Sequence, residues 1–209
     1  MIVKICVVIP WRSQKLRIPA QRATVRFYRE ALDSLDYSII FADSKGEFNR
    51  AEARNIGVSN AIRESADIVI VGDADTIPEK VALLMAINVA ITKSECVLPY
   101  TQYRSLTNLS TLIYLYLNKK FGASIFKEVF GANGSIYVFR PEVWEKCGGQ
   151  DQNFKSWGGE DTAFVIAYKR VFNKDFIRIK GIVIALQHGI NRRQISEANI
   201  KLVQKYKES

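Results

Sequence analysis

The chain has 209 residues, of which 48% are hydrophobic and 24% are charged, so it can bury a sizeable core in one domain and is not a disordered chain. Its apolar runs are far shorter than a membrane span, and its three scattered cysteines (Cys6, Cys96 and Cys147) form no CxxC pair, which excludes a disulfide framework or a cysteine-based zinc site. The net charge of +9 indicates an affinity for anions, such as nucleotide phosphates, nucleic acid or an anionic lipid surface.

The first part of the chain alternates strand-like and helix-like segments. Short apolar runs rich in β-branched residues predict strands, and apolar residues at helical spacing predict helices. In chain order these are a strand at 2–9, a helix near 23–34, a strand at 37–42, a helix at 48–64, a strand at 66–71 and a helix at 79–91. This alternation predicts an α/β fold in which helices cover both faces of a mixed, mainly parallel sheet.

The second part interrupts this rhythm. Strands are expected at 96–99 and 135–139, and between them residues 101–130 contain an amphipathic helix that we interpret as a cap on the acceptor side. A helix at 161–172, a strand-like run at 176–186 and a helix at 194–207 complete the chain. No repeat or linker divides it, so we expect a single domain over residues 1–209.

Two acidic residues follow the third predicted strand in the segment GDADTIP. Asp73 and Asp75 are two residues apart, so in an extended chain their side chains leave the same side where the strand ends. Ligands of open α/β sheets bind at this edge, and paired carboxylates there suit a hard divalent cation. A solvated acidic turn before Pro78 is the alternative interpretation.

The only histidine, His188, follows the strand-like run GIVIAL. A lone histidine is more often structural or exposed than a metal ligand. With Asp73 and Asp75, however, it would form a set of imidazole and carboxylate ligands that suits Mn²⁺, or less ideally Mg²⁺.

The segment SWGGED places two glycines before two adjacent acids that open an apolar helix. A tight turn with an acidic helix cap is one interpretation. In the functional interpretation, Gly158 and Gly159 let the backbone approach a ligand, and Trp157 offers a flat face to a sugar ring. Glu160 and Asp161 could then divide substrate binding from proton abstraction.

Together and in this order, these segments resemble those of nucleotide-sugar glycosyltransferases of the GT-A fold. They are most similar to the inverting galactosyltransferase and N-acetylgalactosaminyltransferase-like group. The resemblance runs from about residue 5 to residue 189, and the segments that carry it are VVIPWR, FNRAEARNIG, GDADTIP, GANGSIYVFRPEVWEKCGG, SWGGED and QHG.

The resemblance implies a role for residues at the ends of the first strands. Pro10, Trp11 and Arg12 would border the nucleotide of the donor. Asp43 would lie at the base or ribose, and Arg50 near the diphosphate. A UDP-sugar is the expected donor.

The resemblance also implies a metal site and a catalytic pair. Asp75 and His188 would bind the metal, with Asp73 nearer the ribose or behind the metal ligands. Glu160 would contact sugar hydroxyls, and Asp161 would act as the general base. A single displacement at the anomeric carbon would then invert its configuration.

A glycan is the expected acceptor, although Thr162, Ala163 and Phe164 replace the further acids that the group often has after WGGED. Without a stem or membrane anchor, a cytoplasmic enzyme of bacterial or phage origin is expected rather than a Golgi enzyme. Contact with a membrane surface is compatible with the charge.

Other functions are compatible with some features of the sequence. A sugar-nucleotide pyrophosphorylase needs a glycine-rich loop after its first strand. Here that segment reads PWRSQKLR and contains no glycine, which argues against this function. A non-catalytic nucleic-acid-binding protein is favoured by the net charge and by clusters of basic residues, namely Lys119, Lys120, Arg192 and Arg193. A phage-type transferase acting on modified bases in DNA combines both ideas.

Overall fold

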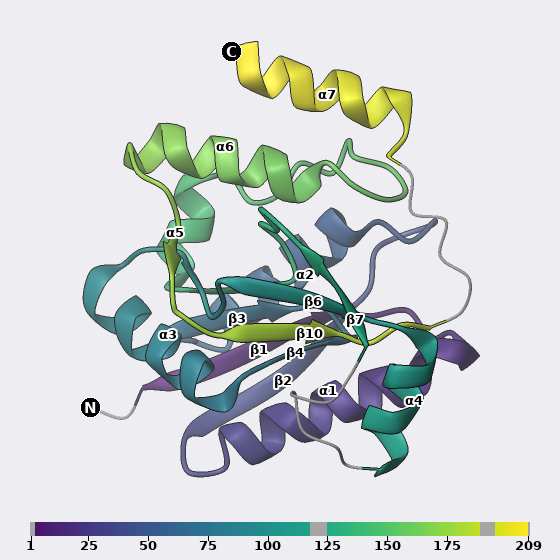
Figure 1. The fold of residues 1–209 in the computed structure, drawn as a ribbon. Helices are drawn as coiled ribbons and strands as arrows, with labels where there is room; N and C mark the ends of the chain where they lie inside the picture. The colour runs from purple at the N-terminus through teal and green to yellow at the C-terminus, as the bar shows by residue number, and fades with distance from the viewer. Residues whose placement is uncertain (1–2, 118–124, 189–194, 209) are drawn as a thin grey trace.

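A computed structural model describes residues 3–117, 125–188 and 195–208 of the protein. The basic clusters at Lys119, Lys120, Arg192 and Arg193 lie outside these ranges. Two sheets form the centre of the molecule, and helices pack around them (Figure 1). The three cysteines are free, as the sequence predicted.

The larger sheet has six strands in the order β2-β1-β3-β8-β5-β9. Strand β1 pairs in parallel with β2 and β3, whereas β8 runs antiparallel to β3 and β5. The mixed sheet with a parallel centre matches the predicted α/β class. Its strands are β1 (Lys4–Pro10), β2 (Asp36–Ala42), β3 (Ile68–Gly72), β5 (Val97–Leu98), β8 (Ile136–Phe139) and β9 (Ile177–Arg178).

Helices cover both faces of this sheet. Strands β2 and β3 lie on opposite sides of β1, so right-handed crossovers put α1 (Ile18–Ala31) and α2 (Arg50–Arg63) on opposite faces. Helix α1 begins five residues before its predicted start at 23. Pro19 stands in its first turn, where a missing N–H group leaves no hydrogen bond unmade. Helix α3 (Lys80–Lys93) adds its buried face to the same core.

The smaller sheet has four strands in the order β4-β10-β6-β7. The predicted helix within 101–130 is present as α4 (Asn108–Leu117), but it connects two strands that the sequence did not predict. They were missed because they are partly polar and lack a continuous apolar run. The run 176–186 likewise divides into β9 and β10. The strands of this sheet are β4 (Thr76–Pro78), β6 (Gln102–Leu106), β7 (Phe126–Val129) and β10 (Ile182–Ala185).

Three further helices follow β8. They are α5 (Pro141–Lys146), α6 (Glu160–Phe172) and α7 (Glu197–Glu208). Helices α6 and α7 contact each other above the larger sheet (Figure 1). The bounds of α6 and α7 agree with the predicted helices at 161–172 and 194–207 to within three residues at each end. A short 3-10 helix, Lys15–Arg17, precedes α1.

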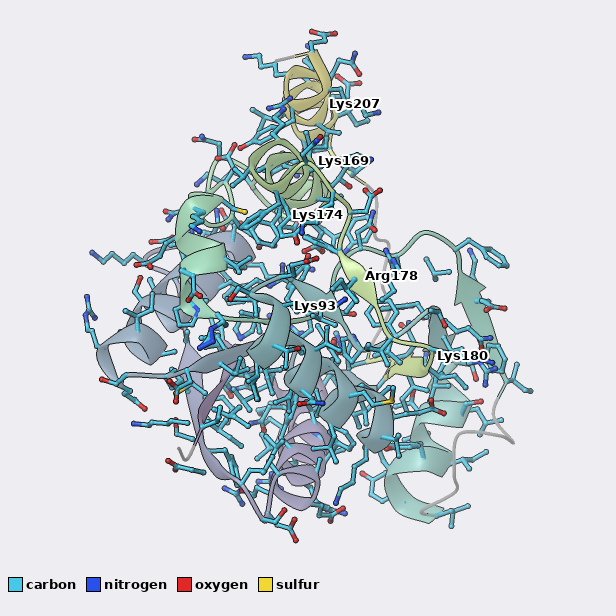
Figure 2. The ribbon with its side chains drawn as sticks, turned by 90° about the vertical axis from the view of Figure 1, so that its left-hand side faces the viewer. Lys93, Lys169, Lys174, Arg178, Lys180 and Lys207 are labelled. Atoms are coloured by element: carbon cyan, nitrogen blue, oxygen red, sulfur yellow. The ribbon has the colours of Figure 1, made fainter. Side chains whose placement is uncertain are left out.

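Six basic side chains lie on the side of the molecule that faces the viewer in Figure 2, which we call the basic side. It carries Lys93, Lys169, Lys174, Arg178, Lys180 and Lys207 (Figure 2). Two of these charges are compensated, because Lys169 pairs with Asp175 and Lys174 pairs with Glu95. The other four make no ion pair within the described residues.

Candidate active site

The candidate site lies where three parallel strands end. Strands β1, β2 and β3 end at Pro10, Ala42 and Gly72, so the residues that follow share one edge of the sheet. Crevices beyond the carboxyl ends of parallel strands are the usual ligand sites of open α/β sheets. Arg12, Asp43 and Asp73 therefore lie along one edge of the sheet.

Arg12 and Asp43 form a bidentate ion pair at this edge. Arg12 Nε lies 2.9 Å from Asp43 Oδ2, and Arg12 Nη2 lies 2.8 Å from Asp43 Oδ1. The guanidinium also donates to the carbonyl oxygens of Ser44 and Gly46. Trp11 N donates to the carbonyl oxygen of Ala42 at 2.8 Å. The ends of β1 and β2 are thus held together, with Arg12 and Asp43 partly exposed.

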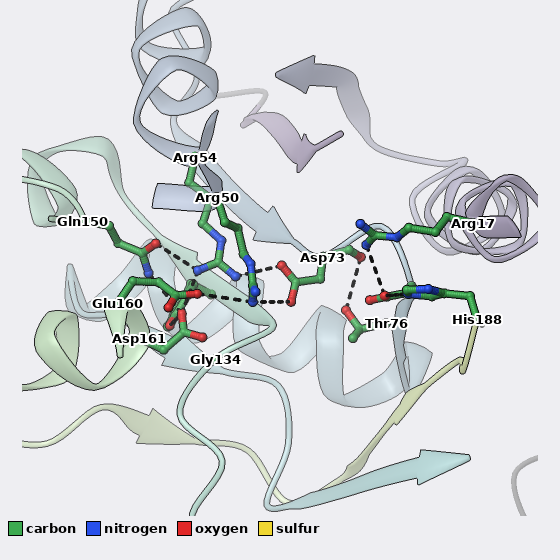
Figure 3. A network of polar contacts seen from close by, with 12 residues as sticks. Arg17, Arg50, Arg54, Asp73, Thr76, Gly134, Gln150, Glu160, Asp161 and His188 are labelled. Carbon is green, nitrogen blue, oxygen red and sulfur yellow. Dashed lines mark hydrogen bonds and ion pairs between the residues drawn. The ribbon is translucent and has the colours of Figure 1, made fainter. Parts of the chain in front are cut away.

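The structure brings Asp75 and His188 together across 113 positions of the sequence. His188 Nε2 lies 2.7 Å from Asp75 Oδ2. The pairing of β10 with β4 carries His188 to this position, and Leu186 N donates to the carbonyl oxygen of Asp75 at 2.8 Å. Arg17 Nη2 lies 3.3 Å from the same Asp75 oxygen, as Figure 3 shows.

Asp73 contacts a different set of side chains from Asp75. Its Oδ1 lies 2.7 Å from Arg54 Nη2, and its Oδ2 lies 3.9 Å from Arg50 Nη1. The expectation that the side chains of Asp73 and Asp75 leave the same side of the chain is therefore wrong. Strand β3 ends at Gly72 and residues 74–75 form a turn, so the two-residue alternation of a strand does not reach Asp75.

Arg54 is the centre of a buried polar network (Figure 3). Its side chain has no exposed surface. Arg54 Nη2 donates to Asp73 Oδ1 at 2.7 Å. Arg54 Nη1 donates to Asp161 Oδ1 at 2.7 Å and to Gln150 Oε1 at 2.9 Å. Arg54 thereby joins the end of β3 to the start of α6. Sequence reasoning missed it, although it lies one helical turn after Arg50 and so on the same face of α2.

The Asp161 carboxylate is held by three donors on one oxygen. Oδ1 accepts from Arg54, from Tyr137 Oη at 2.6 Å and from Gln150 Nε2 at 3.1 Å. Burial alone would raise the pKa of Asp161, but the charges of Arg54 and Arg50 and the Tyr137 hydrogen bond lower it below its ordinary value. Asp161 is therefore ionised at neutral pH. Tyr137 and Gln150 were also missed by sequence reasoning.

The second oxygen of Asp161 lies directly over Gly134. A Cβ atom added to Gly134 would lie 2.1 Å from Oδ2, so any side chain there would displace the carboxylate. Gly134 and Asp161 both line one cavity, and Oδ2 makes no hydrogen bond within the described residues. This oxygen is the group of Asp161 that can receive a proton.

Glu160 opens α6 and is only 3% exposed. Burial, followed by the charge of Asp161, raises its pKa, although Arg50 acts in the opposite direction. Arg50 Nη1 lies 3.3 Å from Glu160 Oε1. The pKa values of the two adjacent acids are thus shifted in opposite directions, which makes Glu160 more readily protonated than Asp161.

The glycines before these acids have conformations that other residues rarely adopt. Gly158 and Gly159 have φ angles of +92° and +105°. A Cβ atom on Gly159 would lie 2.5 Å from the Phe154 ring. Asn199 of α7 donates to the carbonyl oxygens of Lys155 and Gly158, and it fixes the loop from behind. Trp157 is 38% exposed at the front of this loop.

A cavity of about 570 Å³ lies in front of these groups. Its lining includes Arg50, Asp73, Trp157, Glu160, Asp161 and Gln187. This volume is within the range of sites for small organic ligands. The cavity brings the end of β3, the SWGGED loop and the residue next to His188 to one space.

Asp75 and His188 are the residues here that could hold a metal. The described residues contain no cluster of three or more His, Cys, Asp or Glu side chains arranged for a metal. Asp75 and His188 supply one carboxylate and one imidazole, a set that suits Mn²⁺ when phosphate oxygens complete the coordination. The donor set therefore fits a cation that is shared with a diphosphate.

Comparison with known proteins identifies the fold. No family model and no curated protein sequence matches the chain. Among solved structures, the catalytic domain of Drosophila beta-1,4-galactosyltransferase 7 with xylobiose matches 98% of this chain and 81% of its own length, with a TM-score of 0.68 and 16% identity. The protein has a GT-A glycosyltransferase fold.

Two further structures support the same fold. A mutant of the Drosophila enzyme with manganese, UDP-Gal and xylobiose has a TM-score of 0.58 and 14% identity, and the match covers 85% of this chain and 65% of that one. GalNAc-T7 with UDP, GalNAc and Mn²⁺ has a TM-score of 0.53 and 12% identity. That match covers 99% of this chain and about half of the other, at 48%.

Proposed function

We propose that the protein is an inverting, metal-dependent glycosyltransferase that transfers a sugar from a UDP-sugar to an acceptor hydroxyl, most naturally on a glycan. The observation that carries this proposal is the position of the Asp161 carboxylate at the cavity. Three donors hold its Oδ1, and Oδ2 remains available over Gly134. The GT-A fold supports the assignment to sugar transfer.

The donor nucleotide would lie along the carboxyl ends of β1 and β2. In this proposal Pro10, Trp11 and Arg12 border the nucleotide, and Asp43 contacts its base or ribose. Arg50, between Asp73 and Glu160, would face the diphosphate. The edge position of these residues supports this role.

Asp75 and His188 would hold the divalent cation, with Mn²⁺ preferred over Mg²⁺. Their contact at 2.7 Å and the mix of imidazole and carboxylate support this assignment. Manganese is bound in both the Drosophila mutant and the GalNAc-T7 structures. When bound, such a cation neutralises the charge of the departing diphosphate. Asp73, held by arginines, would lie behind these ligands or nearer the ribose.

Asp161 would act as the general base. Its Oδ2 takes the proton of the acceptor hydroxyl while that oxygen attacks the anomeric carbon. The bond from this carbon to the diphosphate oxygen breaks on the opposite face, so the nucleoside diphosphate leaves and the configuration inverts. Glu160 would contact sugar hydroxyls, and Trp157 would pack on the sugar ring, while Gly158 and Gly159 allow close backbone approach.

A second acceptor class is DNA that carries hydroxylated bases. The basic side supports it, because four of its six cations have no ion-pair partner within the described residues. Phosphate backbones are attracted to such surfaces. A non-catalytic nucleic-acid-binding protein would use the same surface but would not need the cavity at Asp161.

The test is an assay of UDP release from a panel of UDP-sugars with Mn²⁺. One arm supplies saccharide acceptors, one supplies hydroxymethylated DNA, and one supplies no acceptor. NMR of the anomeric proton in the product gives the stereochemical outcome. Acceptor-dependent UDP release with inversion is expected. Tight nucleic-acid binding without turnover of any donor would refute the enzymatic proposal.

A further inference from the structure

Helix α4 turns its most apolar stripe toward solvent. Leu109, Leu112, Tyr116 and Leu117 follow the i, i+3, i+7, i+8 spacing of one helix face. Their exposed fractions are 63%, 53%, 71% and 63%. Ser110 and Thr111, which are polar, are buried instead. The helix is therefore inverted with respect to the usual arrangement of a surface helix.

A hydrogen bond and apolar packing hold α4 in this orientation. Gln187 N donates to Thr111 Oγ1 at 2.8 Å, while Thr107 Oγ1 accepts from Ser110 N at 3.2 Å and caps the start of the helix. Tyr114 and Leu115 pack on the small hydrophobic cluster around Leu106. Rotating α4 to bury the leucines would break the bond from Gln187 to Thr111 and the packing of Tyr114 and Leu115. The apolar stripe is thus a fixed feature of the surface.

A row of arginines lies on the neighbouring helix. Arg22, Arg26 and Arg29 occupy i, i+4 and i+7 of α1, and all three are exposed. The two helices pack together, since Ala23 and Phe27 join the same cluster as Tyr114 and Leu115. Figure 1 shows α1 and α4 side by side at one end of the molecule.

The charge next to the apolar stripe is mainly positive. Burial, followed by the charge of Glu30, raises the pKa of Tyr114, and Arg26 acts in the opposite direction, so both of these charged residues of α1 lie near α4. Glu30 is the acidic residue on α1, against three exposed arginines. The combined surface therefore offers apolar side chains and positive charge together.

We propose that α4 and the exposed face of α1 dock on an anionic lipid bilayer. Leu109, Leu112, Tyr116 and Leu117 would enter the boundary between headgroups and acyl chains, and the arginines would contact anionic headgroups. The contact would be peripheral, because no helix among the described residues has the length and apolar character needed to cross a membrane. This inference does not depend on the proposed sugar transfer.

A second copy of the chain is a poorer occupant of this surface. Two copies joined through α4 would bring their arginine rows together, and each chain has a net charge of +9. Like charges at close range oppose association. An anionic bilayer satisfies both the apolar and the charged part of the surface.

The test is sedimentation of the full chain with vesicles of phosphatidylcholine, either alone or mixed with phosphatidylglycerol. Two variants are compared with wild type. The glutamate variant combines Leu112→Glu and Tyr116→Glu, and the arginine variant combines Arg22→Gln, Arg26→Gln and Arg29→Gln. The matched control is Val81→Glu with Met85→Glu, which alters apolar side chains of α3 that are 70% and 51% exposed. All these side chains are exposed, so thermal unfolding should change little, and it is measured for each variant.

Wild type and control should sediment with the mixed vesicles and be released by salt. The arginine variant should bind roughly a hundredfold more weakly, at about one kcal/mol per cation, and the glutamate variant should lose binding. Equal binding to both vesicle types, unchanged binding of either variant, or equal loss in the control would overturn the proposal. So would a wild-type dimer that ignores vesicles and is dissociated by the glutamate variant, which would assign the surface to a second copy.

Discussion

Arg54 Nη1 and Asp161 Oδ1 lie 2.7 Å apart, although 107 residues separate them in the sequence. The same guanidinium contacts Asp73, so one buried cation compensates two partly buried carboxylates. This relationship sets the ionisation of Asp161 and the position of its free oxygen. It also makes the stability of the fold and the chemistry of the cavity depend on one side chain.

Asp161→Asn should abolish proton abstraction while it keeps the shape of the carboxylate. We expect kcat to fall by roughly 10²–10⁴-fold with little change in donor affinity. Steady-state kinetics and calorimetric titration of the UDP-sugar measure the two quantities. Asp175→Asn, which alters an exposed acid paired with Lys169, is the control and should retain full activity. Wild-type turnover of Asp161→Asn would exclude it as the base.

Arg54→Met should destabilise the protein by about 3–5 kcal/mol, because it removes a fully buried cation and leaves the partly buried Asp73 and Asp161 carboxylates without it. Urea unfolding measures this change. Arg63→Met removes an exposed arginine from the same helix and should change stability by less than about 0.5 kcal/mol. A small effect of Arg54→Met would mean that Arg50 alone can hold the two acids.

Glu160 and Asp161 should have opposite effects on the pH dependence of stability. The raised pKa of Glu160 means that its ionisation opposes folding once the pH rises above about 4.3, its unfolded value. Glu160→Gln should therefore stabilise the protein at neutral pH, with the gain vanishing in acid. The lowered pKa of Asp161 means that its ionised form stabilises the fold above about pH 3.9, the pKa of an aspartate in the unfolded chain. This contribution is lost as the pH falls through the pKa that Asp161 has in the folded protein.

Urea unfolding between neutral and acidic pH tests both signs. Asp161→Asn should be less stable than wild type at neutral pH, and the two proteins should converge in acid. A Glu160→Gln variant that is less stable at neutral pH would contradict the raised pKa. It would mean that the contact with Arg50 outweighs the cost of burying the charge.

Asp75→Asn should weaken Mn²⁺ binding by at least about tenfold. Even residues that only hydrogen-bond to a metal ligand contribute roughly 10–100-fold to metal affinity, and a direct ligand should contribute no less. Calorimetric titration of Mn²⁺ in the presence of UDP measures this directly. A chelator should remove activity from the wild-type enzyme. Full activity in chelator, or unchanged Mn²⁺ affinity in Asp75→Asn, would remove Asp75 from the metal site.

Much of the fold could be predicted because it depends on local patterns. The β-branched runs of β1 and β3 and the apolar spacing of α2 and α6 act within a few residues, and each appears close to its predicted position. The partly polar strands β6 and β7 could not be predicted this way. They exist only because β10 and each other supply their hydrogen-bond partners.

The site was predicted only in part for the same reason. Asp75, His188, Glu160 and Asp161 stand out in the sequence because their segments form recognisable motifs. Arg54 and Tyr137 lie within two of these segments and Gln150 directly follows one, but nothing in the local sequence shows that their side chains meet Asp161.

Tertiary structure also decided which face of α4 is buried. Periodicity predicted the helix, but the bond from Gln187 to Thr111 turned its polar side inward and its leucines outward. Local sequence determines which residues share a helix face. Which face is buried depends on polar partners that only the folded chain brings within hydrogen-bond distance.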